Sequence, residues 1–192
     1  MLRTSLRCLR WLDVKIYNTA GGIYAVKIRS ATQSDIKALA DIHIESWKDS
    51  YSDVLPPEFL AEQIDLDLAK HWNEIDMQNE DIILVAEENS LIGFVAVWCR
   101  PFPFIDNLHV KPSHRSKKIG SKLMKAVAKK LIHNGHKTAY LWVFESNENA
   151  ILFYERLGGV QKEQSMKTVF GYDILSRKIE WDDIGTISEV RL

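Results

Sequence analysis

The sequence predicts one α/β domain in which helices pack on a mixed β-sheet. Its 192 residues are the length of a single domain with a core of ordinary size. Segments that alternate apolar and polar residues, or that hold short apolar runs, recur between segments with apolar residues at helical spacing. Along the chain they read as β-α-α-β-β-β-α-β-α-β-β, with no internal repeat and no low-complexity linker.

The regular pattern begins at residue 26, after a basic start. The first 25 residues carry one acidic side chain and four basic ones: Arg3, Arg7, Arg10 and Lys15. This composition fits a targeting presequence, a disordered extension, or a start codon placed too early. We favour an extension outside the fold, with residues 26–192 forming the domain. Deletion of residues 1–25 is expected to leave a soluble, active protein.

Periodicity and turn residues delimit the expected elements. Strands are expected at residues 25–31, 81–98 (a pair around the turn "EENS"), 104–110, 137–144 and, as one or two strands, 169–181. Helices are expected at residues 34–47, 58–75, 119–135 and 147–159. Ser34 is the expected N-cap of the first helix, Pro56 and Pro57 separate the first two helices, and Gly135 is the expected C′ residue of the third.

Charge, hydropathy and cysteine content argue against several classes of protein. The 25 basic and 26 acidic residues nearly balance, so a nucleic-acid partner is not expected. No apolar run approaches the roughly 18 residues that span a bilayer, so no membrane association is expected. Cys8 and Cys99 form no CxxC pair, which favours a reduced, cytoplasmic compartment. The histidines show no ligand spacing, so no metal site is expected.

A short basic loop, "HRSKKIGSKLM" at residues 114–124, joins the expected strand "FIDNLHV" to an amphipathic helix. A helix N-terminus offers unpaired N–H groups and the positive end of the helix dipole, and Arg115, Lys117 and Lys118 can pair with phosphate oxygens. These features alone fit a phosphate site and a solvated basic turn equally well. The loop matches neither the P-loop nor the dinucleotide-binding pattern, which argues against ATP, GTP and NAD.

Two motifs resemble those of the GNAT N-acetyltransferases. "NLHVKPSHRSKKIGSKLM" is similar to the acetyl-CoA loop of that family, [QR]-x-x-G-x-[GA], with Arg115 at the first position and Gly120 at the last. Lys118 replaces the middle glycine, and Ser116 replaces the glycine that often follows the arginine. The stretch "NENAILFYERLGG" matches the second motif, N-x-x-A-x-x-F-Y-E-x-x-G, position for position. The resemblance covers about residues 26–181.

The resemblance implies an acetyl-CoA-dependent N-acetyltransferase with a mostly antiparallel sheet and helices on both faces. Dimers are common in the family, so the resemblance is compatible with a homodimer, but the sequence leaves the oligomeric state open. The strand before the loop would pair with the pantetheine arm, and the backbone amides of the loop would bind the pyrophosphate. The cofactor-binding positions implied are Leu108, Val110, Arg115, Ser116, Lys117, Lys118, Ile119, Gly120, Ser121, Asn147 and Tyr154.

The missing glycines are tolerable if the loop has helical or extended backbone angles at those positions, because only a positive φ demands glycine. In that case the backbone still holds the phosphate, and lysine side chains add charge to it. We therefore expect Lys118→Gly to leave cofactor binding largely intact.

Acetyl transfer to an amine requires an uncharged nucleophile, a stabilised oxyanion and a leaving thiolate. Tyr154 matches the family position that often protonates the thiolate; the alternative is an aromatic that packs the short helix on the sheet. The candidate bases are Asp106 first, Glu145 second, and His109.

Strand alternation helps to place two of these candidates. It predicts Asp106 on the face of Leu108 and Val110, and His109 on the opposite face with Ile105 and Asn107. Each candidate base also has an ordinary interpretation as a solvated or hydrogen-bonded surface group.

For the acceptor we expect a primary amine of a small molecule or peptide, attacking directly in a ternary complex. Trp47 and Tyr51 lie four residues apart and could wall a pocket, although core packing is the favoured role for Trp47. The segment "RPFPF", residues 100–104, is a second candidate lip. Acidic residues near the first helix would suit a cationic amine, and a solvated helix face explains them equally well: Asp41, Glu45, Asp49 and Asp53. The competing hypothesis is a non-catalytic acyl-CoA-binding sensor or interaction module.

Overall fold

The computed structural model describes residues 25–76 and 80–190. Residues 1–24, 77–79 and 191–192 lie outside this description, and with them Cys8 and nearly all of the expected N-terminal extension. The order of the long helices and strands along the chain confirms the predicted order, and a short helix follows at the C-terminal end.

Seven strands form one sheet in the order β1-β2-β3-β4-β5-β7-β6. All neighbouring pairs are antiparallel except β4 and β5, which are parallel. This mixed, mostly antiparallel sheet confirms the predicted fold class. The strands are β1 (Lys27–Ser30), β2 (Ile82–Glu87), β3 (Leu91–Trp98), β4 (Phe104–Val110), β5 (Ala139–Phe144), β6 (Val160–Val169) and β7 (Tyr172–Trp181).

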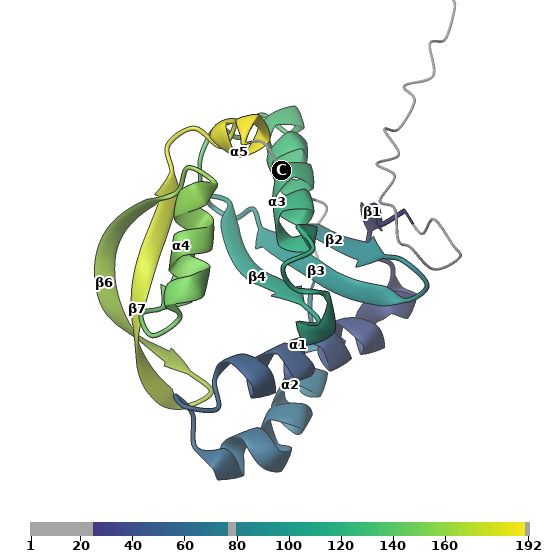
Figure 1. Ribbon diagram of the computed structural model, residues 1–192, viewed down its shortest axis with the longest axis vertical. Coiled ribbons are helices and arrows are strands. Elements are labelled where there is room, and N and C mark those ends of the chain that lie inside the picture. Colours follow the sequence, from purple (N-terminus) through teal and green to yellow (C-terminus); the bar gives the residue numbers. More distant parts are fainter. Residues whose placement is uncertain (1–24, 77–79, 191–192) are drawn as a thin grey trace, which may run out of the picture.

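Helices cover both faces of the sheet, as expected. One face carries α1 (Ile36–Ser50) and α2 (Ile64–Asn73), and the other carries α3 (Ile119–His133) and α4 (Glu148–Arg156). Figure 1 shows α3 beside β2–β4 and α4 beside the β6–β7 hairpin. Because both faces are covered, β2 and β3 are buried almost throughout, which explains their continuous apolar runs.

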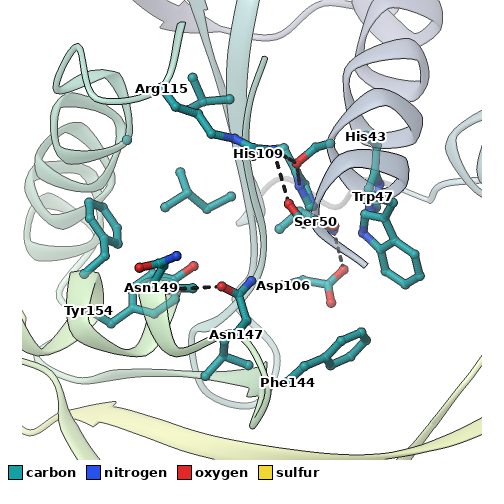
Figure 2. Close-up of a pocket in the computed structure, with 18 of the residues that line it drawn as sticks. His43, Trp47, Ser50, Asp106, His109, Arg115, Phe144, Asn147, Asn149 and Tyr154 are labelled. Carbon is teal, nitrogen blue, oxygen red and sulfur yellow. Dashed lines mark hydrogen bonds between the residues drawn. The ribbon is translucent and has the colours of Figure 1, made fainter. Parts of the chain in front are cut away.

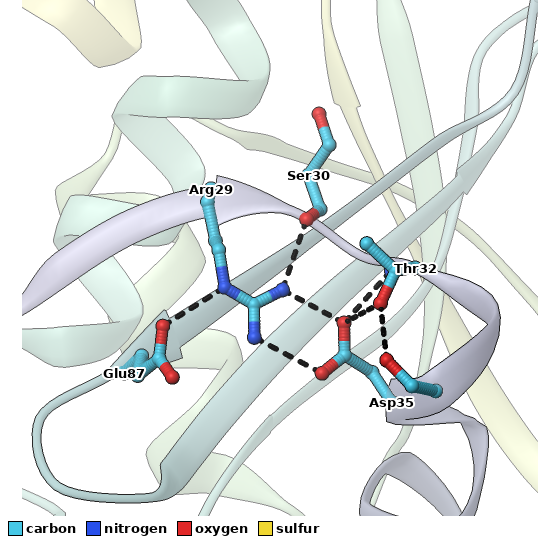
Figure 3. Close-up of polar contacts among 6 residues, drawn as sticks. Arg29, Ser30, Thr32, Asp35 and Glu87 are labelled. Carbon is cyan, nitrogen blue, oxygen red and sulfur yellow. Dashed lines mark hydrogen bonds and ion pairs between the residues drawn. The ribbon is translucent and has the colours of Figure 1, made fainter.

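A polar cluster holds the start of α1, in place of the expected Ser34 cap. Thr32 is the N-cap of a short 3-10 turn that leads into α1. The Asp35 carboxylate accepts hydrogen bonds from the Thr32 N–H at 2.7 Å and from Arg29 Nη1 and Nη2 at 2.7 and 3.0 Å, while Arg29 Nε reaches Glu87 at 2.8 Å (Figure 3). The hydrogen bond from Arg29 holds the pKa of Asp35 well below its usual range. The cluster thus ties β1 and β2 to α1.

The C-terminal part holds more regular structure than predicted. β6 begins at Val160, whereas a strand was expected only from residue 169, and α5 (Thr186–Glu189) follows β7. β6 lies at the edge of the sheet and its side chains are mostly exposed, so its sequence has no apolar alternation to reveal it. Within the described residues, no helix combines the length and the apolar character needed to span a membrane.

Candidate active site

A large cavity opens where β4 and β5 part. The two strands are paired only at Phe104 and Tyr140, and later residues of both strands line a cavity of about 1410 Å³. Among the described strands, none pairs with the β5-facing edge of β4 beyond Phe104, so backbone groups on this edge remain for a ligand. The cavity exceeds the roughly 300–1,000 Å³ of ordinary small-molecule sites, so it suits an extended ligand.

A β-bulge interrupts the side-chain alternation of β4. Asn107 pairs with Ala96 and Ile105 pairs with Val97, so Asp106 has no partner residue on β3. The extra residue moves Ile105 to the α3 face, where it packs in the core with Val97. The predicted placement of Ile105 on the face of His109 is therefore wrong.

The same bulge turns Asp106 away from the face of Leu108 and Val110, on which it was predicted. Trp98, which packs on the α1–α2 side, donates from Nε1 to Asp106 Oδ2 at 2.9 Å, and Asn107 Nδ2 donates to the same oxygen at 2.7 Å. The carboxylate is open to the cavity but lies deep in the molecule, and this burial raises the pKa of Asp106. A carboxylate with a raised pKa is a better proton acceptor near neutral pH.

The loop before α3 has left-handed backbone at both positions where this chain has replaced a glycine of the resembled motif. The φ angles are 61° at Ser116 and 63° at Lys118. The condition under which the missing glycines would be tolerable is therefore not met. A left-handed residue with a side chain costs roughly 1–2 kcal/mol, so the loop keeps this shape against a local penalty.

The loop delivers the N-terminus of α3 to the cavity. The N–H groups of Ile119, Gly120 and Ser121 precede the first helical hydrogen bond, which runs from Lys122 N to Lys118 O at 3.0 Å. A Cβ on Gly120 would lie 3.3 Å from Phe153 Cζ, so the glycine lets α3 approach α4 closely. Of the cofactor-binding residues predicted in the loop, Arg115, Ser116, Lys118, Ile119, Gly120 and Ser121 line the cavity, and Lys117 does not.

The side chain of Arg115 leaves the loop and reaches α1. Its guanidinium pairs with Asp49 and donates to Ser46 Oγ at 3.3 Å and to Ser50 Oγ at 3.2 Å. Any phosphate contact from this residue would therefore come from its backbone. Of the four acidic residues noted near the first helix, Asp49 alone lines the cavity, and this ion pair already occupies it.

Tyr154 and Asn147 stand on the α4 side of the cavity, facing Trp47 of α1 across Asp106 in Figure 2. Burial raises the pKa of Tyr154, which keeps its phenol protonated at neutral pH. Asn147 is the N-cap of α4 and accepts from the Ala150 N–H at 3.1 Å. Both residues line the cavity, as Leu108 and Val110 do from β4.

His109 is a poor base in this structure. Burial, assisted by the charge of Arg115, lowers the pKa of His109 to about 3, and its Nδ1 lies 3.0 Å from Ser46 Oγ. The centroid of its ring lies 4.2 Å from that of His43, with the two rings tilted by 30°, and His43 Nδ1 accepts from Trp72 Nε1 at 3.1 Å. Burial also holds the pKa of His43 well below its usual value, so both rings are neutral at pH 7.

Glu145 is engaged elsewhere. Arg177 donates to its two carboxylate oxygens at 3.0 and 2.8 Å, and this hydrogen bonding lowers the pKa of Glu145. Glu145 lines a second, smaller hollow beside α4 rather than the central cavity. The structure does not bring it together with Tyr154 and Asp106, and a paired carboxylate with a lowered pKa is a weak base.

Aromatic side chains form the wall opposite the loop. Trp47 is both buried and part of the lining, so its two predicted roles coexist. Its ring lies 5.2 Å from Tyr51, 5.9 Å from Phe144 and 5.5 Å from Phe170, measured between centroids. Of the "RPFPF" segment, only Phe104 lines the cavity.

Several lining residues escaped the sequence analysis. His71 comes from α2, Asn149 from α4, and Lys167 and Phe170 from the β6–β7 hairpin. No motif marks them, because they meet only when distant elements fold together. One local signal was available for Phe170: the pair "FG" between two strands indicates a tight turn, where an exposed aromatic is unusual. Within the described residues, no three His, Cys, Asp or Glu side chains gather as a metal site would require.

Comparison with known families decides the affiliation of the chain. The profile described as "Acetyltransferase (GNAT) family" matches residues 37–159, which include the loop, β4 and α4. The chain belongs to the GNAT family. This membership confirms the predicted enzyme class, an acetyl-CoA-dependent acyltransferase.

Relatives within the GNAT family include proteins with and without a named acceptor. The chain is 21% identical over 170 residues to the "Uncharacterized N-acetyltransferase YuaI" of Bacillus subtilis, covering 84% of this chain and 96% of that protein. It is 27% identical over 146 residues to the "Spermidine N(1)-acetyltransferase" of Thermoplasma acidophilum, covering 70% of this chain and 88% of that protein.

Solved GNAT structures share the fold. The PaiA N-acetyltransferase of Thermoplasma acidophilum, solved in complex with coenzyme A, superposes with a TM-score of 0.58 at 22% identity, over 79% of this chain and 97% of that one. An N-acetyltransferase from Staphylococcus aureus Mu50 superposes with a TM-score of 0.63 at 24% identity, over 83% of this chain and 98% of that one.

Proposed function

We propose that this GNAT protein transfers the acetyl group of acetyl-CoA to a primary amine by direct attack in a ternary complex. The observation that carries the proposal is the cavity between β4 and β5. It is lined on one side by the N-terminus of α3 and on the other by an aromatic wall, with Asp106 and Tyr154 between them. A site for a long anionic cofactor thus adjoins a separate compartment for an acceptor.

The residues fit the cofactor in three places. The unpaired edge of β4 beside Leu108 and Val110 offers backbone groups to the amide-bearing pantetheine arm. The N–H groups at the start of α3 suit the pyrophosphate, because a helix N-terminus favours anions. Lys118, which also lines the cavity, adds positive charge there. The relative structures solved with coenzyme A or acetyl-CoA support this assignment.

The chemistry follows from the groups that meet in the cavity. Acetyl-CoA supplies a thioester, at which a C–N bond forms as the C–S bond breaks. Asp106, whose pKa is raised by burial, receives the proton that the amine loses, directly or through a water molecule. Tyr154, kept protonated because burial raises its pKa, donates its proton to the departing sulfur, so that coenzyme A leaves as the thiol. Glu145 is left out of this scheme because Arg177 binds it.

A covalent acyl-cysteine route has little support. Cys99 is buried, and burial, followed by the charge of Asp81, raises the pKa of its thiol to about 11. The reactive form of cysteine is the thiolate, which is scarce at such a pKa. Cys99 does not line the central cavity, whereas Asp106 and Tyr154 do.

Two measurements test the proposed function. Titration calorimetry with acetyl-CoA should give one site per chain, and thiol release should require both acetyl-CoA and an amine. Undetectable binding at millimolar acetyl-CoA would contradict the proposal. Binding without thiol release over a panel of polyamines, amino acids, aminoglycosides and peptides would favour the sensor alternative.

A further inference from the structure

The acceptor half of the cavity is aromatic and holds few charges. Its wall is formed by Trp47, Tyr51, Phe144 and Phe170, with Tyr51 4.6 Å from Phe144. Among the described residues, Asp106 is the one lining carboxylate left there once Asp49 is counted with Arg115. A polyamine carries several positive charges that need several carboxylates. This half of the site is therefore better suited to an apolar body than to a polycation.

A cation in the same half of the cavity points to an anion on the acceptor. Lys167 of β6 lines the cavity and holds its Nζ 3.7 Å from the centroid of the Trp142 ring. Among the ion pairs of the described residues, none involves Lys167, and its side chain is half-buried. The neighbouring Lys162 of the same strand has Glu180 and Asp182 beside it. Lys167 thus presents a positive charge, fixed over a ring, that a ligand carboxylate can pair with.

Phe170 is an independent indication that the acceptor has an apolar body. Phe170 and Gly171 form the two-residue turn between β6 and β7, with φ angles of 50° and 83°. Such turns favour Asn at the first position, and a bulky aromatic there is strained. The ring is 37% exposed, lines the cavity and leans on Trp47 and on Phe59, 5.9 Å away. An aromatic held at a strained position on the rim of a site suggests a role in binding.

We infer that the acceptor is a small amine with an apolar or aromatic body and a carboxylate. The body would lie on Trp47 and Phe170, the carboxylate would pair with Lys167, and the amine would face Asp106. This inference rests on the proposed acetyl transfer and narrows its acceptor class. It departs from the relative named as a spermidine acetyltransferase, whose substrate lacks a carboxylate and carries more than one cation.

Paired amines test the inference directly. Thiol release at saturating acetyl-CoA is compared for L-phenylalanine against phenethylamine, for para-aminomethylbenzoate against benzylamine, and for spermidine. We expect kcat/KM to be about tenfold or more higher for the carboxylate-bearing member of at least one pair, as a single good ion pair of about 1.4 kcal/mol allows. A preference for spermidine, or for the members that lack a carboxylate, would overturn the inference and leave the proposed acetyl transfer standing.

Two variants test whether Lys167 and Phe170 of the β6–β7 hairpin recognise the acceptor. Lys167→Met should reduce the preference for the carboxylate-bearing amine about tenfold through KM, and Lys162→Met, outside the cavity, should keep that preference. Phe170→Asn suits the left-handed turn, so it should fold normally while KM rises for both members of a pair. Equal preferences in the Lys167→Met and wild-type enzymes would contradict the role of Lys167. Absence of thiol release with every amine, in a protein that binds acetyl-CoA, would instead contradict the proposed function.

Discussion

The guanidinium of Arg115, in the loop before α3, is bound to the carboxylate of Asp49 near the end of α1. The residue that the family motif would place at the pyrophosphate thus uses its side chain to brace the loop against the acceptor half of the cavity. Both side chains are partly exposed, and an exposed pair of this kind contributes only about 0–1 kcal/mol.

Removing the ion pair between Arg115 and Asp49 should weaken acetyl-CoA binding only modestly. Arg115→Met, Asp49→Asn and the double variant should each weaken acetyl-CoA by a similar factor of about fivefold or less, because all three lose the same pair. Calorimetry on the four proteins provides the double-mutant cycle. If Arg115→Met loses far more affinity while Asp49→Asn gains some, the guanidinium binds phosphate and the brace is secondary.

The left-handed loop residues predict an unusual gain of stability. Lys118→Gly should raise the free energy of unfolding by about 1 kcal/mol, because glycine adopts φ near 63° without the side-chain penalty. Acetyl-CoA affinity should stay largely intact if, as proposed, backbone amides hold the phosphate.

Urea denaturation and calorimetry on Lys118→Gly check both statements. Lys117→Gly is the matched control. Its position is not among the positive-φ residues, so it should lose about 0.5–1 kcal/mol. A collapse of acetyl-CoA affinity in Lys118→Gly alone would mean that the ammonium group, not the backbone, binds the phosphate.

Tyr154→Phe tests the proton donor with little change in packing. The phenyl ring keeps the buried contacts, but the donor to the leaving sulfur is lost, so kcat should fall about 100-fold or more with KM for acetyl-CoA nearly unchanged. Because burial raises the pKa of Tyr154, its ionisation should produce no alkaline loss of activity below pH 10 in the wild type. Full kcat in the variant across this pH range would exclude Tyr154 as the donor.

Asp106→Asn should separate activity from stability. The pKa of Asp106 is raised by burial, so as the pH decreases, wild-type activity should begin to fall at a pH higher than that at which a carboxyl group usually titrates. The variant, which has no carboxylate to accept the proton, should be nearly inactive.

Ionised Asp106 supports activity but lowers the stability of the folded protein. A carboxyl with a pKa raised in the folded state costs stability while it is ionised, and this cost disappears as the pH falls below the pKa of the unfolded chain. At pH 7 the variant should therefore unfold at an equal or higher urea concentration than the wild type, with the difference shrinking in acid. A variant that is both active and less stable would show that Asp106 is a structural acceptor for Trp98 and Asn107.

Local patterns in the sequence carried the prediction of the fold and of the cofactor loop. Helical spacing located α1 to α4 because each helix buries one face, and the apolar runs located β2 and β3 because both their faces are covered. The loop and α4 were recognisable because their residues lie together in the chain. β6 was largely missed because an exposed edge strand carries no apolar pattern.

The sequence by itself determined the element order, the family and the residues that gather around the loop. The tertiary structure decided where those residues point. The β-bulge at Asp106 arises from pairing with β3, and it reverses a face assignment that assumed strict alternation. The structure also revealed the left-handed angles at Ser116 and Lys118, while the capture of Arg115 by Asp49 and the meeting of Lys167 with Trp142 depend on distant segments. Periodicity records only which face of an element is buried, whereas register, backbone strain and side-chain partners are set by what that element packs against.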